Sequence, residues 1–344
     1  MRKIKIILTA CGCPGASTLI KYLKNNGERE IEIIGIDADL EVIGKFLCDK
    51  FYQSPLSDSK EFIPFLLDLA KKEKPDLIFP QSSFDVYPIS LRKPEFESLG
   101  VRVLASDPKA IEIAGDKYKM YEALKGKVDM PKYYYPKNLQ EFINFSEKLG
   151  YPDKIICFKP HVSKGGRGFR FIDAKAKRRD LLMNHKPNSK YISISEFAEI
   201  FKDEKEFPKF IIMEKAQGPE YDAMALCYNN KSLLTTVKTR EKSRWGVITL
   251  GELVNKPEII EQVNKIISII PLKYNISIQF IGTKLIEINP RTSSYIYQDD
   301  LIEPYLAVKL ALGEITPEEI EAYQSKISYG RRMIRYMDQI FWNK

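Results

Sequence analysis

The first hundred residues alternate short apolar stretches with helical stretches, and this alternation constrains the fold more than any other feature of the sequence. Runs rich in Ile and Leu are separated by amphipathic stretches at residues 17–25 and 60–72. The apolar runs occupy residues 4–9, 31–37, 77–80 and 101–104. Short strands separated by helices predict a parallel sheet that is covered by helices. We therefore expect an α/β domain at the N-terminus, of the Rossmann-like kind.

Beyond residue 107 the pattern changes to one in which β-type segments outnumber helices. Such segments occur at 154–160, 168–172, 210–214, 221–228 and 233–238, and predict a mostly antiparallel sheet. Helices are expected at 139–150, 257–270, 301–312 and 317–324, and residues 276–280 and 284–289 should pair as strands. The fold class is therefore predicted to be α/β followed by α+β.

Length and composition limit the class of protein further. The chain has 344 residues, which favours about two domains, and 44% are hydrophobic. Its longest apolar runs fall well short of the roughly 18–20 residues that cross a bilayer, and the N-terminus lacks the pattern of a signal peptide. Five cysteines without CxxC spacing suit a reducing compartment. We expect a cytoplasmic protein with no membrane partner.

The charge balance suits an anionic small substrate. The net charge is 54 − 46 = +8, and it is spread over the chain apart from one cluster at residues 175–179. Aromatic residues do not interleave this cluster, which is interpreted as a solvated face. No nucleic-acid partner is expected.

The segment from Ser277 to Arg291 carries the most specific signal for chemistry. Along its second strand, a period of two places Glu287, Asn289 and Arg291 on one face. The carboxylate and the amide, together with Gln279 on the preceding strand, form a set of oxygen ligands suited to Mg²⁺ on nucleotide phosphates. Arg291 is placed to neutralise a phosphoryl group in transfer.

Two other segments suit the binding of a nucleotide. Lys159 ends a strand and is followed by a Gly-rich loop that contains Ser163, Gly165, Gly166 and Gly168, where backbone amides can approach phosphates closely. The loop does not have the Walker A pattern, and an ordinary hairpin turn is the alternative. The strand at 210–214 ends in Glu214-Lys215-Ala216 and is suited to an adenine edge, although a charged strand end would have the same sequence.

The order and approximate spacing of these motifs, with Asp116-Lys117 before them, resemble those of ATP-grasp enzymes over essentially the whole chain. The use of Gln279 as first metal ligand is similar to the synthetase halves of carbamoyl-phosphate synthase and to the lysine ligase of pyrrolysine synthesis. The chain is too short to be a whole carbamoyl-phosphate synthase.

The resemblance implies a role for each matching residue. Lys117 and Lys159 would contact phosphates, and the loop with Ser163, Gly165, Gly166 and Gly168 would close over the triphosphate. Adenine would be bound by Glu214, Lys215 and Ala216, and ribose by Glu220. The metal, Mg²⁺ with Mn²⁺ as a substitute, would be bound by Gln279, Glu287 and Asn289, and Arg291 would stabilise the transferred phosphate.

The resemblance also implies a domain plan and a reaction. A pre-ATP-grasp domain would span residues 1–110 and the ATP-grasp domain 111–315, with a lid lobe at about 132–238, a metal-binding lobe at about 239–315 and a helical extension at 316–344. ATP would bind between the lobes and activate a carboxylate as an acyl phosphate, which an amine then attacks. The partners would be a small-molecule carboxylate and an amine, and the acceptor would be a small amino acid or sugar acid. A homodimer is left as an open alternative.

The loop that follows the strand at 233–238 is expected to border the acceptor site. Arg240 and Arg244 offer planar forks for a carboxylate, and Trp245-Gly246 would form a wall. A charged surface loop is the alternative.

Two alternative functions are also considered. The N-terminal domain is consistent with an NAD(P)-dependent oxidoreductase, and the whole chain is consistent with a catalytically inactive nucleotide-binding protein. The turn from Gly12 to Ser17 opens a helix after the first strand, with Asp37 further on, but the third glycine of the dinucleotide motif is missing. The turn is also suited to another anion. Asp85 follows the third predicted strand and is equally consistent with substrate binding and with a helix cap.

Overall fold

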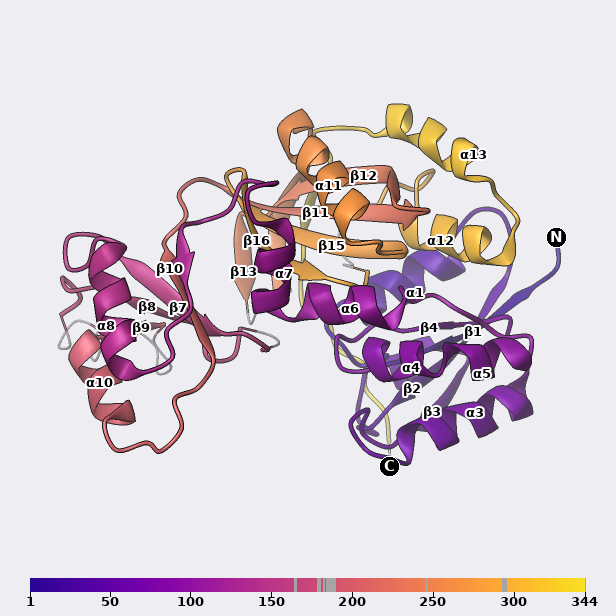
Figure 1. The fold of residues 1–344 in the computed structure, drawn as a ribbon. Coiled ribbons are helices and arrows are strands. Elements are labelled where there is room, and N and C mark those ends of the chain that lie inside the picture. The colour runs from indigo at the N-terminus through magenta and orange to yellow at the C-terminus, as the bar shows by residue number, and fades with distance from the viewer. Residues whose placement is uncertain are drawn as a thin grey trace. The chain divides into compact units, whose positions relative to one another are not determined.

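The computed structural model describes residues 1–163, 166–177, 181, 183, 190–244, 247–292 and 296–343. It divides into two compact units (Figure 1). Unit 1 comprises residues 1–115, 219–280 and 287–344, and unit 2 comprises residues 116–218 and 281–286. Each unit is described by itself.

The first sheet of unit 1 is parallel, with the strand order β3-β2-β1-β4-β5. Its strands are β1 (Ile4–Leu8), β2 (Ile31–Asp37), β3 (Lys50–Gln53), β4 (Leu77–Phe79) and β5 (Arg102–Val103). Its helices are α1 (Ala16–Lys24), α2 (Gly44–Leu47), α3 (Phe62–Glu73), α4 (Val86–Leu91), α5 (Lys93–Ser98) and α6 (Pro108–Gly115). The expected parallel sheet is confirmed, while β3, α2, α4 and α5 were not expected.

Side-chain alternation along β1 divides the packing between the two faces of this sheet. Ile4, Ile6 and Leu8 pack with α1, whereas Ile7 packs with helices α3, α4 and α5. Both sets are fully buried, as expected for a central parallel strand that is covered on both faces.

The second sheet of unit 1 is built from the C-terminal half of the chain. Its order is β13-β14-β12-β11-β15-β16, and β17 pairs with β14. The strands are β11 (Glu220–Tyr228), β12 (Lys231–Thr239), β13 (Lys242–Arg244), β14 (Val247–Val254), β15 (Tyr274–Ile281), β16 (Lys284–Asn289) and β17 (Arg332–Ile334). The helices are α11 (Pro257–Ile269), α12 (Glu303–Leu312), α13 (Pro317–Glu321) and the 3₁₀ helix η1 (Ala322–Lys326). The segment expected to be a helical extension thus contains a strand as well as short helices.

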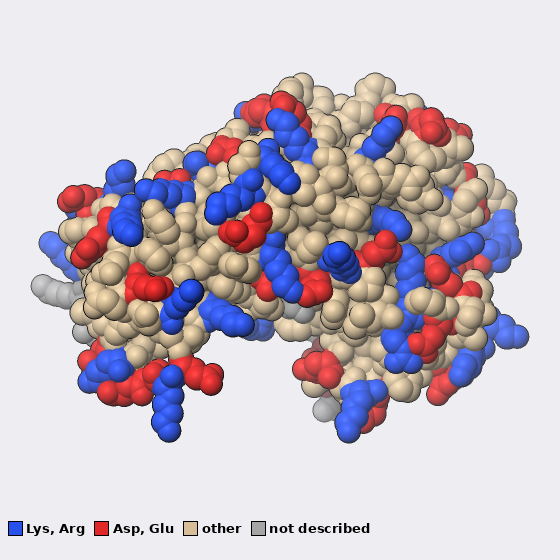
Figure 2. Space-filling view, viewed as in Figure 1, with Lys and Arg blue, Asp and Glu red and all other residues tan. Residues whose placement is uncertain are grey.

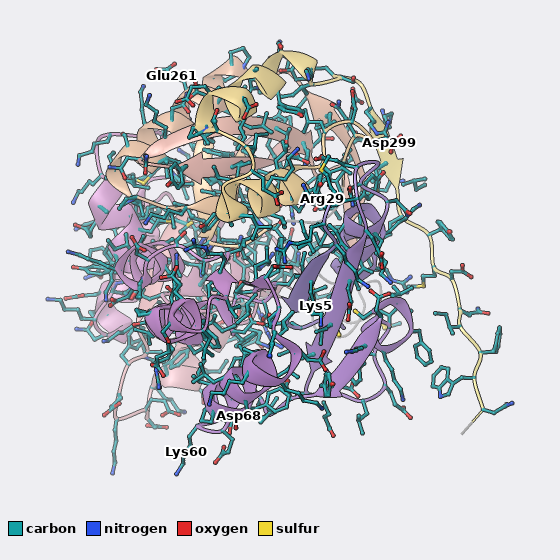
Figure 3. The ribbon with its side chains drawn as sticks, turned by 90° about the vertical axis from the view of Figure 1, so that its right-hand side faces the viewer. Lys5, Arg29, Lys60, Asp68, Glu261 and Asp299 are labelled. Atoms are coloured by element: carbon teal, nitrogen blue, oxygen red, sulfur yellow. The ribbon has the colours of Figure 1, made fainter. Side chains whose placement is uncertain are left out.

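One hydrophobic core joins the two sheets of unit 1 through α12. The core contains residues of β1 and α1 together with Leu306 and Val308 of α12 and Leu226 of β11. Ion pairs lie at its edge, where Arg29, labelled in Figure 3, contacts Glu314 at 2.8 Å. The first 115 residues are therefore packed together with C-terminal elements.

Unit 2 has a five-stranded sheet with the order β6-β10-β7-β8-β9. Its elements are α7 (Lys117–Leu124), β6 (Tyr133–Tyr134), α8 (Leu139–Lys148), β7 (Ile156–Pro160), β8 (Arg170–Ile172), β9 (Tyr191–Ile192), α10 (Ile194–Phe201) and β10 (Phe210–Glu214). All described pairs are antiparallel except β8 with β9. A core rich in phenylalanine packs α8 and α10 on the sheet, with the rings of Phe142 and Phe197 stacked at 3.9 Å.

Charged side chains of both signs are interspersed over the face that Figure 2 presents. This distribution agrees with the even spread of charge in the sequence. Among the described residues, no helix has both the length and the apolar character needed to span a membrane.

Candidate active site

Two buried lysines of unit 2 are held by oxygen atoms of the chain. Lys117 begins α7 after the N-cap residue Asp116, and its Nζ atom donates hydrogen bonds to the carbonyl (3.2 Å) and hydroxyl (3.4 Å) of Ser163. Lys159 lies on β7, and its Nζ atom donates to the carbonyl of Ile286 on β16 at 2.9 Å. Both side chains are nearly inaccessible to solvent. A buried ammonium group is a strong electrostatic attractor for an anion such as phosphate.

The Gly-rich loop begins next to these lysines. Gly165 lies outside the described residues, whereas Gly166 and Gly168 have positive φ angles of 71° and 75°. A Cβ atom on Gly168 would lie 2.6 Å from a ring carbon of Pro160, so this position requires glycine. The role of the loop over a triphosphate stays a prediction.

At the end of β10, both the backbone and the carboxylate of Glu214 have partners in unit 2, and the backbone N–H donates to the carbonyl of Lys132 at 2.9 Å. The carboxylate of Glu214 accepts a hydrogen bond from the backbone N–H of Lys132 at 3.1 Å and lies 3.5 Å from Lys284 Nζ. Lys215 extends over the ring of Phe171, and Ala216 is buried. The adenine contact assigned to Glu214 stays a prediction.

Glu220 and Arg240, which were predicted for different substrates, contact each other in unit 1. Arg240 Nε donates to Glu220 Oε1 at 2.5 Å, and its Nη1 atom lies 3.8 Å from Asp222 Oδ2. Asp222 is buried and accepts a hydrogen bond from the hydroxyl of Ser277. The fork of Arg240 is thus engaged by internal carboxylates, and an acceptor carboxylate would have to compete with them.

The rest of the predicted acceptor loop is partly a strand. Arg244 ends the short strand β13 and is exposed, while Trp245 and Gly246 lie outside the described residues. Arg244 therefore remains a candidate for contact with an acceptor.

Three oxygen-bearing side chains lie on the neighbouring strands β15 and β16 of unit 1. Gln279 is on β15, and Glu287 and Asn289 are on β16. Within the described part of the chain, none of these three side chains makes a hydrogen bond or an ion pair. One carboxylate and two amides offer the hard oxygen ligands that Mg²⁺ prefers, so the residues fit the predicted metal.

Arg291 was expected on the face of the metal strand, but the structure places it outside the strand. β16 ends at Asn289, and the backbone N–H of Arg291 donates to the carbonyl of Asn289 at 2.7 Å in a tight turn. Its Nε atom then donates to Ser83 Oγ at 2.9 Å, and its Nη1 atom to the carbonyl of Thr292 at 2.9 Å. Ser83 could not be identified from the sequence as a partner of Arg291, because it lies 208 residues away along the chain.

The turn after β1 already binds a carboxylate of unit 1, that of Asp37. The backbone N–H of Gly12 donates to Asp37 Oδ2 at 2.9 Å. A Cβ atom on Gly12 would lie 2.5 Å from Val42 Cγ1, so no other residue fits there without rearrangement. Because Asp37 uses this N–H, the turn is poorly suited to the pyrophosphate of a dinucleotide.

Asp85 does not use its side chain as a helix cap. It precedes α4, but its carboxylate accepts hydrogen bonds from the hydroxyl of Thr9 and from the backbone N–H of Ser82 at 3.0 Å. Burial raises the pKa of the Asp85 carboxyl to about 6. Of the two roles considered for Asp85, the cap is therefore not observed.

The raised pKa of Asp85 predicts a pH dependence of stability. Between the ordinary carboxyl pKa of 3.8 and the folded pKa of about 6, the native state binds the proton more tightly than the unfolded state. The contribution of Asp85 to the free energy of unfolding therefore falls as the pH rises from about 4 to 6, by on the order of 2 kcal/mol. Asp85→Asn removes this titration.

Urea unfolding from pH 4 to 7.5 measures the difference between wild type and Asp85→Asn. We expect the advantage of wild type to decline up to about pH 6 and then to level off. Asp68→Asn, at an exposed position of α3 labelled in Figure 3, controls for the loss of one carboxylate. If the difference in unfolding free energy between wild type and Asp85→Asn is independent of pH, the pKa of the Asp85 carboxyl is not raised.

The fold of the chain is similar to that of several solved structures. The structure is similar to the biotin carboxylase domain of 2-oxoglutarate carboxylase from Hydrogenobacter thermophilus, with a TM-score of 0.67 and 18% identity over 96% of this chain and 74% of that one. It is also similar to N5-carboxyaminoimidazole synthetase from Staphylococcus aureus, with a TM-score of 0.62 and 16% identity over 92% and 78% of the chains. A third similar structure is phosphoribosylglycinamide synthetase from Anaerococcus prevotii, with a TM-score of 0.62 and 18% identity over 96% of this chain and 80% of that one. The chain has the ATP-grasp fold.

One family model matches part of the chain. Residues 206–332 match the model described as ATP-grasp in the biosynthetic pathway with Ter operon. This segment contains the predicted metal ligands and Arg291. No significant match exists among the curated proteins. The predicted resemblance to the ATP-grasp superfamily is confirmed.

Proposed function

We propose that this protein is an ADP-forming, ATP-dependent ligase that joins a carboxylate to an amine through an acyl phosphate. The observation that carries the proposal is the set of Gln279, Glu287 and Asn289 on two adjacent strands of an ATP-grasp fold, with no described protein partners for their side chains. Mg²⁺ held there would neutralise nucleotide phosphates during transfer. The similar carboxylase domain from Hydrogenobacter thermophilus was solved with magnesium ADP and bicarbonate, which supports this assignment.

The other residues supply binding and charge stabilisation. Lys117 and Lys159 attract phosphate oxygens, since both ammonium groups are buried. Arg291 offers its guanidinium to the transferred phosphate, held by Ser83 and by the carbonyl of Thr292. Retention of Glu287, Asn289 and Arg291 argues against an inactive nucleotide-binding protein, because simple binding does not require groups for transfer.

The cellular setting is also part of the proposal. All five cysteines are free thiols, which agrees with a reducing compartment such as the cytoplasm. The substrates would be small molecules. The similar carboxylase domain is a dimer, and we propose a homodimer for this chain as well.

Binding of ATP with magnesium is expected to stabilise the fold. A ligand that binds only the native state adds RT ln(1 + [L]/Kd), about 2.7 kcal/mol at a hundredfold excess over Kd. Differential scanning fluorimetry with Mg-ATP, Mg-ADP and NADH measures the effect. We expect a higher Tm with both adenine nucleotides and none with NADH. A Tm that rises with NADH alone would contradict the proposal and favour the oxidoreductase alternative.

A further inference from the structure

Two of the five cysteines meet above one glycine of the parallel sheet in unit 1. Cys11 follows β1, and its backbone N–H donates to the carbonyl of Ile36 on β2 at 3.1 Å. Cys48 follows α2 and precedes β3, and its backbone N–H donates to the carbonyl of Gly44 at 2.9 Å. The strands β1 and β3 flank β2 in the sheet. Backbone hydrogen bonds therefore fix both cysteines, one from each side of β2.

Gly35 of β2 shows how close the two thiols lie. A Cβ atom added there would be 2.6 Å from Cys48 Sγ and 2.9 Å from Cys11 Sγ. Both sulfur atoms therefore lie next to the same point above this glycine. Gly44 of α2 is also in contact with the pair, because a Cβ atom on it would be 2.4 Å from Cys11 Sγ. Only glycine fits at these two positions while both thiols keep their places.

The two thiols differ in exposure and in protonation. Cys11 is fully buried in the hydrophobic core of unit 1, whereas Cys48 is half-buried. A hydrogen bond to Cys48, and in addition burial, raises the pKa of the Cys11 thiol, so Cys11 keeps its proton. Cys48 is therefore the member of the pair that an oxidant reaches and that reacts as a thiolate.

We propose that Cys11 and Cys48 are a redox modification site, at which a peroxide oxidises the two thiols to an intramolecular disulfide. The proposal goes beyond the ligase activity and does not depend on it. The structure contains the reduced pair, since both thiols are free. In a reducing compartment, disulfides of this kind form transiently and serve in redox sensing.

A metal site is the other common use of adjacent thiols. Among the residues that the structure describes, no cluster of three or more His, Cys, Asp or Glu side chains is suited to hold a metal ion. Structural metal sites of cysteine and histidine have four ligands, so two thiols alone do not make one. The geometry of the pair therefore favours the disulfide.

The oxidation balances with hydrogen peroxide as the oxidant. The Cys48 thiolate attacks one oxygen of the peroxide and the O–O bond breaks, which leaves a sulfenic acid on Cys48 and releases hydroxide. That hydroxide takes up the proton that Cys48 gave up and becomes water. The Cys11 sulfur then attacks the Cys48 sulfur, the S–O bond breaks, and the departing hydroxide leaves as water with the Cys11 proton. The two thiols lose two electrons, and the peroxide is reduced to two molecules of water.

Peptide mapping of the full chain before and after peroxide treatment tests the proposal. The protein is alkylated in denaturant, digested and analysed by mass spectrometry, and free cysteine in a parallel sample shows that the treatment is strong enough to form cystine. We expect one peptide that joins Cys11 to Cys48, a fall of the alkylated thiols from five to three, and a return to five after dithiothreitol. The chain should remain monomeric on a non-reducing gel. Five alkylated thiols after the treatment, or a cross-link between other cysteines, would overturn the proposal.

Three variants assign the role of each thiol. In Cys11→Ser, Cys48 lacks its partner, so dimedone should trap its sulfenic acid. In Cys48→Ser, Cys11 should stay reduced because it is buried. Cys13→Ser is the matched control: Cys13 is a half-buried thiol of the same turn, and its loss should leave the yield of the Cys11–Cys48 disulfide within twofold of wild type.

The variants also give results that would contradict the proposal. Loss of the disulfide in Cys13→Ser, or dimedone labelling of Cys11 in Cys48→Ser, would show that a different thiol reacts first. The cross-link itself is mapped on the wild-type chain, so that result does not depend on how the variants fold. Stabilisation by Mg-ATP tests the ligase proposal separately, because the disulfide requires no nucleotide.

Discussion

Glu287→Gln is expected to lower turnover by about 10²-fold or more while the fold stays intact. The substitution keeps the shape of the side chain but removes the single carboxylate from the set of Gln279, Glu287 and Asn289. Loss of this charge weakens the hold on a divalent cation at the point where charge develops during phosphoryl transfer. Steady-state ADP formation measures turnover, and electron paramagnetic resonance of free Mn²⁺ in the presence of ADP measures metal binding without catalysis.

A matched control is available on α11. Glu261, labelled in Figure 3, is exposed and pairs with Lys265 at 2.7 Å, so Glu261→Gln should leave both turnover and Mn²⁺ binding unchanged. Near-normal turnover and Mn²⁺ affinity in Glu287→Gln would place the metal site elsewhere.

Lys238→Met is expected to cost about 3–5 kcal/mol of unfolding free energy. Lys238 on β12 and Glu303 at the start of α12 are both inaccessible to solvent, and Lys238 Nζ lies 3.3 Å from Glu303 Oε1. The same oxygen accepts a hydrogen bond from the hydroxyl of Thr236 at 2.7 Å, and Glu303 Oε2 has no described partner. Removal of the lysine therefore leaves a buried carboxylate without its cation.

Urea unfolding of three variants tests this explanation. Lys238→Met combined with Glu303→Leu replaces the pair by apolar side chains and should recover most of the loss. Lys265→Met removes an exposed partner of Glu261 and should change stability by less than about 1 kcal/mol. Equal losses in Lys238→Met and in the double variant would indicate lost packing rather than an unpaired charge.

Local elements could be predicted well wherever the sequence pattern is strong. The strands β2, β10 and β16 occupy the predicted residues 31–37, 210–214 and 284–289, because short runs of apolar residues mark them in the sequence. The strand β14 was missed although it has eight residues, and the short strands β3 and β17 were missed as well. The two short strands have three or four residues, which is too few for a period of two to be recognised, and each is stabilised by pairing with another strand.

The partners of side chains could not be predicted, since packing of distant segments decides them. The sequence gives no reason to pair Arg240 with Glu220 or Arg291 with Ser83, which are 20 and 208 residues apart. Asp37 was considered for a dinucleotide, whereas the fold brings it to the N–H of Gly12. The sequence shows which residues have side chains suited to metal and phosphate chemistry. The fold decides which hydrogen bonds and ion pairs these side chains make.

The nucleotide products formed by the purified protein test the central proposal most directly. Mg-ATP is supplied with a panel of carboxylic acids and with hydroxylamine, which attacks an acyl phosphate to give a hydroxamate, and ³¹P NMR identifies the phosphorus products. A carboxylate–amine ligase of this class gives ADP and inorganic phosphate in equal amounts, with at least one hydroxamate that depends on Mg²⁺. Formation of AMP and pyrophosphate, or no turnover with any acid of the panel, would contradict the account.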